Sequence, residues 1–108
     1  MKETILRQAT KFENIKEIIY NSVKMYPNNV AFVTKIIKEK GVTYKNTTYK
    51  KMLDEINALG SALYKLGLKG KRIAICGRNR YEWALSHLSC LLGGMCSVPL
   101  DKELQVDE

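Results

Sequence analysis

Hydrophobic residues recur at helical spacing in two stretches of the first half of the chain, residues 15–26 and 49–66. Asn14 precedes the first stretch and Glu17 follows three residues later, which predicts a capping box at the start of a helix. Pro27 predicts the end of that helix, because the residue before a proline is pushed out of the helical region. The second stretch carries its apolar residues on one face and therefore predicts an amphipathic helix.

Between these helices the pattern changes to that of a β-hairpin. Residues 30–37 are mainly β-branched and aromatic and predict a strand, and residues 42–45 predict the strand that returns beside it. A polar turn that ends at Gly41 connects the two strands. Residues 46–48 are also polar and predict a second turn, in which Thr48 caps the following helix.

Two glycines mark the second helix. Gly67 follows its last apolar position and predicts a helix end in the left-handed conformation. Gly60 lies inside the helix, on its apolar side, where glycine costs about 1 kcal/mol relative to alanine. Close packing of the helix against a sheet is the expected reason for this glycine.

Residues 71–101 organise the second half of the chain. The continuous apolar run 72–76 predicts a strand buried on both faces, and residues 95–98 predict a second buried strand. A helical segment separates them, so the unit is expected to be a right-handed βαβ crossover. The predicted fold class is α/β, with a β-hairpin plus this βαβ unit and helices packed on the sheet. Residues 14–108 are expected to form a single subdomain, preceded by an arm at residues 1–13.

Six residues define the motif positions of the βαβ unit: Asn79, Glu82, Trp83, Gly94, Pro99 and Asp101. Asn79 is expected to cap the helix, and Glu82 stands three residues later to complete a capping box. Trp83 widens the apolar face of the helix, and Gly94 belongs to the glycine pair that ends it. Pro99 is expected to end sheet pairing because proline has no N–H to donate.

The net charge of +7 raises the question of nucleic-acid binding, because Lys and Arg outnumber Asp and Glu by 18 to 11. The lysines are spread along the chain without a compact basic run, which gives a weak electrostatic footprint for nucleic acid. A small basic nucleic-acid-binding module therefore remains an alternative, and a stand-alone interaction scaffold is another.

The three cysteines, Cys76, Cys90 and Cys96, form no CxxC pair and have no histidine cluster beside them. Reduced thiols in the core of a cytoplasmic protein are the expected interpretation, rather than a disulfide or a metal site. Two of the three fall in the predicted buried strands.

The residues alone predict no catalytic, cofactor-binding or metal-binding side chain. The turn at residues 76–80 has one glycine, whereas the dinucleotide fingerprint requires three. Arg78 and Arg80 flank a helix start at which an anion could bind, although solvated arginines, or arginines paired with acids outside this sequence, are the simpler interpretation. His87 is the only histidine, and its position in mid-helix favours a surface or locally hydrogen-bonded side chain.

Several short motifs occur in a characteristic order from residue 26 onward. They are Pro27–Ala31 (P-x-x-x-A), Val42–Tyr44 (similar to I-T-Y), Ser61–Gly67 (similar to A-x-x-L-x-x-x-G), Lys71–Ile75 (similar to D-R-V-A-I), Asn79–Trp83 (N-x-x-E-W) and Gly93–Asp101 (similar to G-A-x-x-V-P-L-D). Lys71 stands where this pattern usually has Asp. From about Asn14 to the C-terminus, the chain thus resembles the N-terminal part of adenylate-forming enzymes of the acyl-CoA synthetase (AMP-binding) superfamily. The Asn-Arg-Tyr-Glu-Trp and Pro-Leu-Asp-Lys-Glu-Leu variants most resemble bacterial long-chain fatty acid–CoA ligases.

The resemblance implies an enzyme that activates a fatty acid with ATP and Mg²⁺ to an acyl-adenylate and then transfers the acyl group to CoA. It places the phosphate loop, the ATP-binding acidic segment, the ribose-binding Asp and the C-terminal lysine of the family beyond Glu108. A partial, structural and catalytically inactive N-terminal subdomain is therefore expected, with the remainder of the AMP-binding domain as its partner. Exposed sheet edges predict self-association of the isolated chain, and a fatty acyl substrate makes peripheral membrane contact of the parent enzyme plausible.

Overall fold

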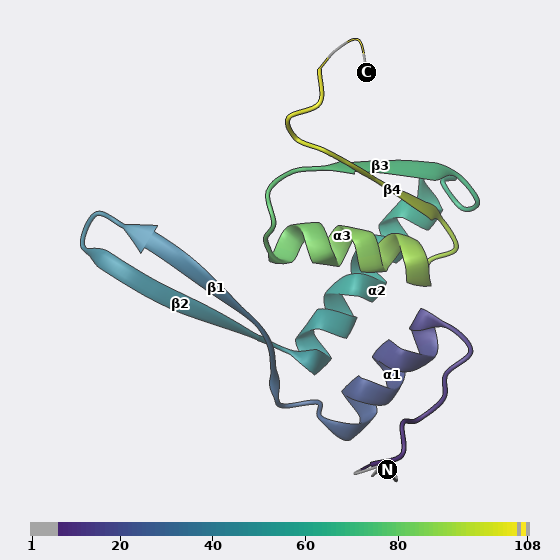
Figure 1. Cartoon of the computed structure of the whole chain (residues 1–108), viewed down its shortest axis with the longest axis horizontal. Coiled ribbons are helices and arrows are strands. Elements are labelled where there is room, and N and C mark those ends of the chain that lie inside the picture. The colour runs from purple at the N-terminus through teal and green to yellow at the C-terminus, as the bar shows by residue number, and fades with distance from the viewer. Residues whose placement is uncertain (1–6, 106, 108) are drawn as a thin grey trace, which may run out of the picture.

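The computed structural model describes residues 7–105 and residue 107. Three helices and four strands follow one another in the order shown in Figure 1: α1 (Ile15–Met25), β1 (Val30–Lys38), β2 (Gly41–Thr48), α2 (Tyr49–Lys65), β3 (Arg72–Cys76), α3 (Tyr81–Leu92) and β4 (Cys96–Leu100). The order of elements agrees with the predicted α/β class. Residues 7–13 of the predicted arm carry no helix or strand, and residues 1–6 lie outside the described residues.

The first helix begins as its sequence predicts. The Asn14 side chain accepts a hydrogen bond from the Glu17 backbone N–H at 2.9 Å, which confirms the N-cap. The Glu17 carboxylate reaches one residue further back than in a standard capping box, because it accepts from the Glu13 N–H at 2.9 Å. The helix ends at Met25, and Tyr26 before Pro27 has left the helical conformation.

The hairpin is longer than its sequence predicts. Its antiparallel strands pair from Lys38 opposite Gly41 down to Val30 opposite Thr48, so residues 46–48 belong to β2. The predicted second polar turn is therefore wrong. Asn46 and Thr47 pair with β1, and Thr47 is buried at the base of the hairpin. Thr48 still caps α2 as predicted, since its hydroxyl accepts from the Lys51 N–H at 3.2 Å.

Helices α2 and α3 pack against each other at a glycine-rich crossing. A Cβ built on Gly60 would lie 3.7 Å from the Ser89 carbonyl oxygen of α3, so Gly60 faces a helix and not the expected sheet. A Cβ on Gly93 would lie 2.7 Å from the same oxygen, which leaves no room for a side chain. Gly67 has φ +79° just after α2, which confirms the left-handed helix end.

Strands β3 and β4 pair in parallel, from Arg72 opposite Cys96 to Cys76 opposite Leu100, which confirms the βαβ unit. Pro99 does not end the pairing, because it lies inside β4 opposite Ile75. A proline is tolerated there because, among the described residues, β4 has a strand neighbour on one side only. The two strands form a sheet separate from the hairpin.

The expected burial of both faces of these strands is wrong, since only Ile75 of β3 is buried and no residue of β4 is. Cys76 and Cys96 are exposed, whereas Cys90 of α3 is buried. A pair of strands covered by helices on one side leaves its other side to solvent, and that accounts for the difference. Cys90 joins Ile75 and Met95 in the core cluster, on which Leu63, Ile73 and Trp83 pack.

The chain exposes far more surface than a compact protein of its mass. Its accessible area is 9105 Å², whereas a compact monomer of 12.3 kDa exposes about 6,100 Å². The radius of gyration is 17.4 Å, compared with about 13 Å for a compact domain of this length. The projecting hairpin and the extended segment after β4 both contribute to this shape (Figure 1). None of the described helices combines the length and apolar character needed to cross a membrane.

Candidate functional site

The strongest candidate site lies where β3 and β4 end and α3 begins. Two adjoining hollows of about 430 Å³ each occupy this edge of the sheet. One is lined by Ile75, Cys76, Gly77, Arg78, Arg80, Glu82, Trp83 and Ser86, and the other by Gly77, Arg78, Asn79, Trp83, Leu100, Asp101 and Lys102. Open α/β sheets bind ligands at the carboxyl ends of their parallel strands, so this position is typical of a ligand-binding site.

The motif residues of the sequence divide between this site and the rest of the fold. Asn79, Trp83 and Asp101 line the second hollow together, and Glu82 lines the first. Pro99 lies inside β4, and neither it nor Gly94 is in either lining. Gly94 follows α3 with φ +79° and accepts a hydrogen bond from the Gly70 N–H at 2.9 Å, so it shapes the turn into β4.

The expected cap on α3 is wrong. The helix begins one residue later than expected, so Arg80 occupies the N-cap position with extended backbone angles of −149° and 174°, and no side chain caps the helix. Asn79 therefore lies outside the helix, and Glu82 is its second residue, where its carboxylate is favourable at the positive end of the helix. The second capping box does not form.

Trp83 forms a wall shared by both hollows. Its indole stacks on the His87 ring, with ring centroids 5.2 Å apart and planes inclined by 24°. His87 Nδ1 lies 2.7 Å from the Ser97 Oγ, so this histidine has a local hydrogen-bond partner, as its mid-helix position indicated. The stack lies within α3, and the His87–Ser97 contact ties α3 to β4. A tryptophan fixed in this way gives the hollows a rigid apolar side.

The charges around the hollows are mixed. Arg78, Arg80 and Lys102 supply positive charge, and Glu82 and Asp101 supply negative charge. Within the described part of the chain, neither arginine forms an ion pair. Asp101 accepts a hydrogen bond from the Glu103 N–H at 2.9 Å, which orders the chain after β4. These groups could orient an anion, but they include no nucleophile paired with a base.

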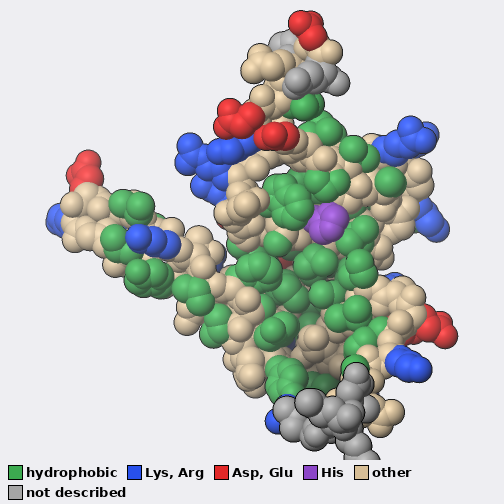
Figure 2. Space-filling model, in the orientation of Figure 1, with side chains coloured by type: hydrophobic (Ala, Val, Ile, Leu, Met, Phe, Trp, Pro, Cys, Tyr) green, Lys and Arg blue, Asp and Glu red, His purple; other side chains and the backbone are tan. Residues whose placement is uncertain are grey.

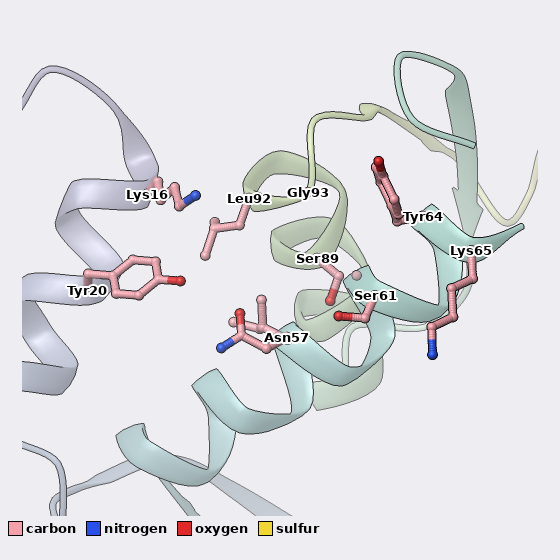
Figure 3. A pocket seen from close by; sticks show the side chains of 11 residues that line it. Lys16, Tyr20, Asn57, Ser61, Tyr64, Lys65, Ser89, Leu92 and Gly93 are labelled. Atoms are coloured by element: carbon pink, nitrogen blue, oxygen red, sulfur yellow. The ribbon is translucent and has the colours of Figure 1, made fainter. Parts of the chain in front are cut away.

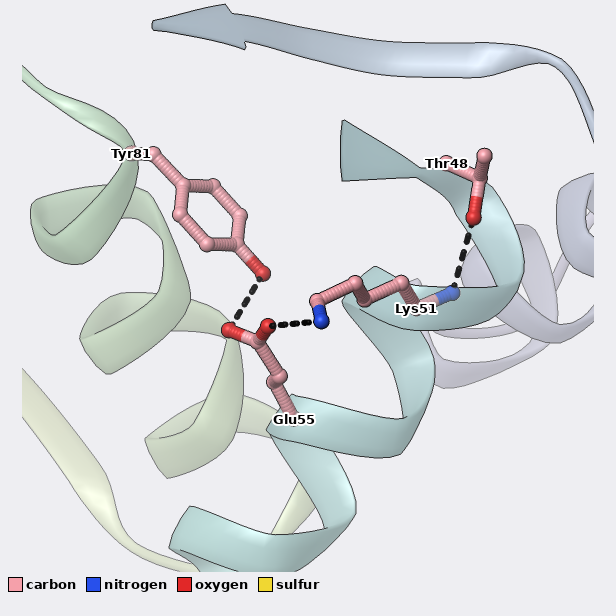
Figure 4. Close-up of polar contacts among 4 residues, drawn as sticks. All are labelled: Thr48, Lys51, Glu55 and Tyr81. Atoms are coloured by element: carbon pink, nitrogen blue, oxygen red, sulfur yellow. Dashed lines mark hydrogen bonds and ion pairs between the residues drawn. The ribbon is translucent and has the colours of Figure 1, made fainter. Parts of the chain in front are cut away.

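A second polar cluster joins the base of the hairpin to the helices (Figure 4). The Tyr81 hydroxyl donates to the Glu55 carboxylate at 3.1 Å, and Lys51 lies 3.9 Å from the other oxygen of that carboxylate. The Tyr81 ring also contacts Phe32 of β1, with centroids 5.0 Å apart. Burial raises the pKa of Tyr81 well above its usual value, and Glu55 raises it further. The i, i+4 spacing of Lys51 and Glu55 was the only sequence signal for this cluster.

A groove of about 350 Å³ separates α1 from α2 and α3 (Figure 3). Lys16 and Tyr20 extend from α1 toward Leu92 of α3, and Asn57 lies on the α2 side. Small residues of α2 and α3, among them Ser61 and Ser89, line the opposite wall. No motif of the sequence predicted this groove, because it depends on how three helices are placed in space.

The part of the chain that the structure describes contains no cluster of three or more His, Cys, Asp or Glu side chains that could hold a metal ion. Burial raises the pKa of the Cys90 thiol, with a smaller contribution from Cys96, so this cysteine is held in its neutral form.

The sequence profile described as "AMP-binding enzyme" matches residues 19–108, which is most of the chain. The chain belongs to the AMP-binding enzyme family. The resemblance drawn from its motifs is thereby confirmed.

Among curated members of this family, long chain acyl-CoA synthetase 1 of Arabidopsis thaliana is 34% identical over 86 residues, which are 78% of this chain and 13% of that protein. Fatty acyl-CoA synthetase A of Dictyostelium discoideum is 32% identical over 110 residues, which cover 91% of this chain and 16% of that protein. The chain thus spans about a seventh of the length of such relatives.

Solved structures of adenylate-forming enzymes share the fold. The N-terminal subdomain of Klebsiella oxytoca NpsA superposes with a TM-score of 0.72 at 20% identity, over 89% of this chain and 23% of that one. A fatty acid AMP ligase from Legionella pneumophila gives a TM-score of 0.72 at 19% identity, over 88% of this chain and 16% of that one. The arrangement of hairpin, helices and βαβ unit is therefore that of the N-terminal part of this fold.

Proposed function

We propose that this chain is the N-terminal part of an ATP-dependent fatty acid–CoA ligase and serves there as a scaffold of the AMP-binding domain. The observation that carries the proposal is the match of the family profile over residues 19–108. The curated relatives described above support a fatty acyl substrate, since their names specify long-chain or fatty acyl-CoA synthetases.

The surface of the chain supports the role of a scaffold. About 3,000 Å² is exposed beyond what a compact monomer of this mass shows, so the chain has surface available for packing against the rest of a larger domain. The remainder of the AMP-binding domain is the partner that the family provides for such a surface. In this proposal Trp83, Pro99 and the Gly94 turn shape the sheet edge against which that remainder packs, while Asn79, Glu82 and Asp101 line the hollows beside it.

The parent enzyme would use ATP and Mg²⁺ to form an acyl-adenylate, and CoA to accept the acyl group. The described residues lack the features that would bind ATP and Mg²⁺. Residues 76–80 supply one glycine to their turn instead of a glycine-rich phosphate loop, and no metal-binding cluster occurs in the described part of the chain. No step of the reaction is therefore assigned to these residues.

An ATP–pyrophosphate exchange assay tests the absence of catalysis. The purified 108-residue chain is expected to give no exchange above a blank with any fatty acid, while Arabidopsis long chain acyl-CoA synthetase 1 in the same buffer serves as the positive control. Fatty-acid-dependent exchange by the chain alone would contradict the scaffold role.

The coding sequence downstream of the Glu108 codon tests the assignment to a ligase. It is expected to encode a Ser/Thr/Gly-rich loop followed by lysine and, further on, the remaining family segments. The alternative of a nucleic-acid-binding module has no support among the relatives, and tight, salt-dependent binding to generic DNA or RNA would revive it.

A further inference from the structure

We draw no further inference here: the strongest candidate, the surface of the projecting β1–β2 hairpin with its intermingled hydrophobic and basic side chains (Figure 2), carries none, because nothing in the structure shows what covers that surface in the whole protein.

Discussion

Alanine at Gly93 tests how closely the end of α3 packs on its surroundings. The added Cβ would lie 2.7 Å from the Ser89 carbonyl oxygen and 2.8 Å from the Met95 Cε. The methionine side chain can move, but the carbonyl belongs to the backbone of α3 and accepts the Gly93 N–H hydrogen bond at 3.0 Å. The substitution must therefore shift the helix end or break that bond.

The cost follows from this geometry. Overpacking of a tight site typically destabilises a protein by about 1–3 kcal/mol. Each kcal/mol lowers the melting temperature of a domain of roughly this size by about 4–8 °C. Gly93→Ala is thus expected to lower the melting temperature by at least about 4 °C.

Two other glycines supply the controls for the same substitution. At Gly60 the new Cβ would lie 3.7 Å from the Ser89 oxygen, an ordinary contact, and alanine gains about 1 kcal/mol over glycine inside a helix. Gly60→Ala is therefore expected to stabilise the chain. At Gly77 an added Cβ would have no atom within 4 Å, so Gly77→Ala should change stability by less than about 0.5 kcal/mol.

Urea unfolding followed by far-ultraviolet circular dichroism measures all three variants against the wild type. The expected order of midpoints is Gly60→Ala highest, then the wild type with Gly77→Ala, then Gly93→Ala. The close packing at Gly93 is refuted if Gly93→Ala unfolds at or above the wild-type midpoint. An equal loss for Gly60→Ala and Gly93→Ala would show instead that the helices approach too closely at both positions.

Two further substitutions test the polar contacts. Thr48→Ala removes the α2 cap and is expected to cost about 1 kcal/mol in urea unfolding, whereas Thr43→Ala, in an exposed part of β2, should cost less. Tyr81→Phe removes the bond to Glu55 and is expected to cost about 1 kcal/mol near neutral pH. Because folding raises the pKa of Tyr81 above its ordinary value of 10.0, the contribution of Tyr81 to stability should be constant below about pH 10 and fall above it as the unfolded state ionises first. Tyr81→Phe should lose less stability over that alkaline range, and an identical alkaline profile for both proteins would contradict the burial of this hydroxyl.

Local signals in the sequence determined most of the secondary structure. Asn14 and Thr48 each supply a side-chain oxygen that caps a helix, and Gly67 supplies the left-handed residue that ends one. Such contacts span three or four residues, so the residues themselves contain the information. The order of the motifs likewise sufficed to identify the family.

The start of α3 shows where local reasoning fails. Asn79 and Glu82 have the spacing of a capping box, yet the helix begins after Arg80. The turn between β3 and α3 must also place α3 against both α2 and β3. This packing competes with the preference of Asn79 for the N-cap position. Residues 46–48 are similar, since pairing with β1 outweighed their turn composition.

The sequence by itself therefore determined the helices, the hairpin, the parallel βαβ unit and the family. Only the tertiary structure decided which faces are covered. It placed Gly60 against a helix instead of a sheet, left Cys76 and Cys96 exposed, and gathered Asn79, Trp83 and Asp101 around one hollow. Burial depends on neighbours distant in the chain, and here the described elements cover only one side of each sheet. The apolar pattern of a sequence indicates which faces tend to be buried. The arrangement of the whole chain determines which of those faces are buried.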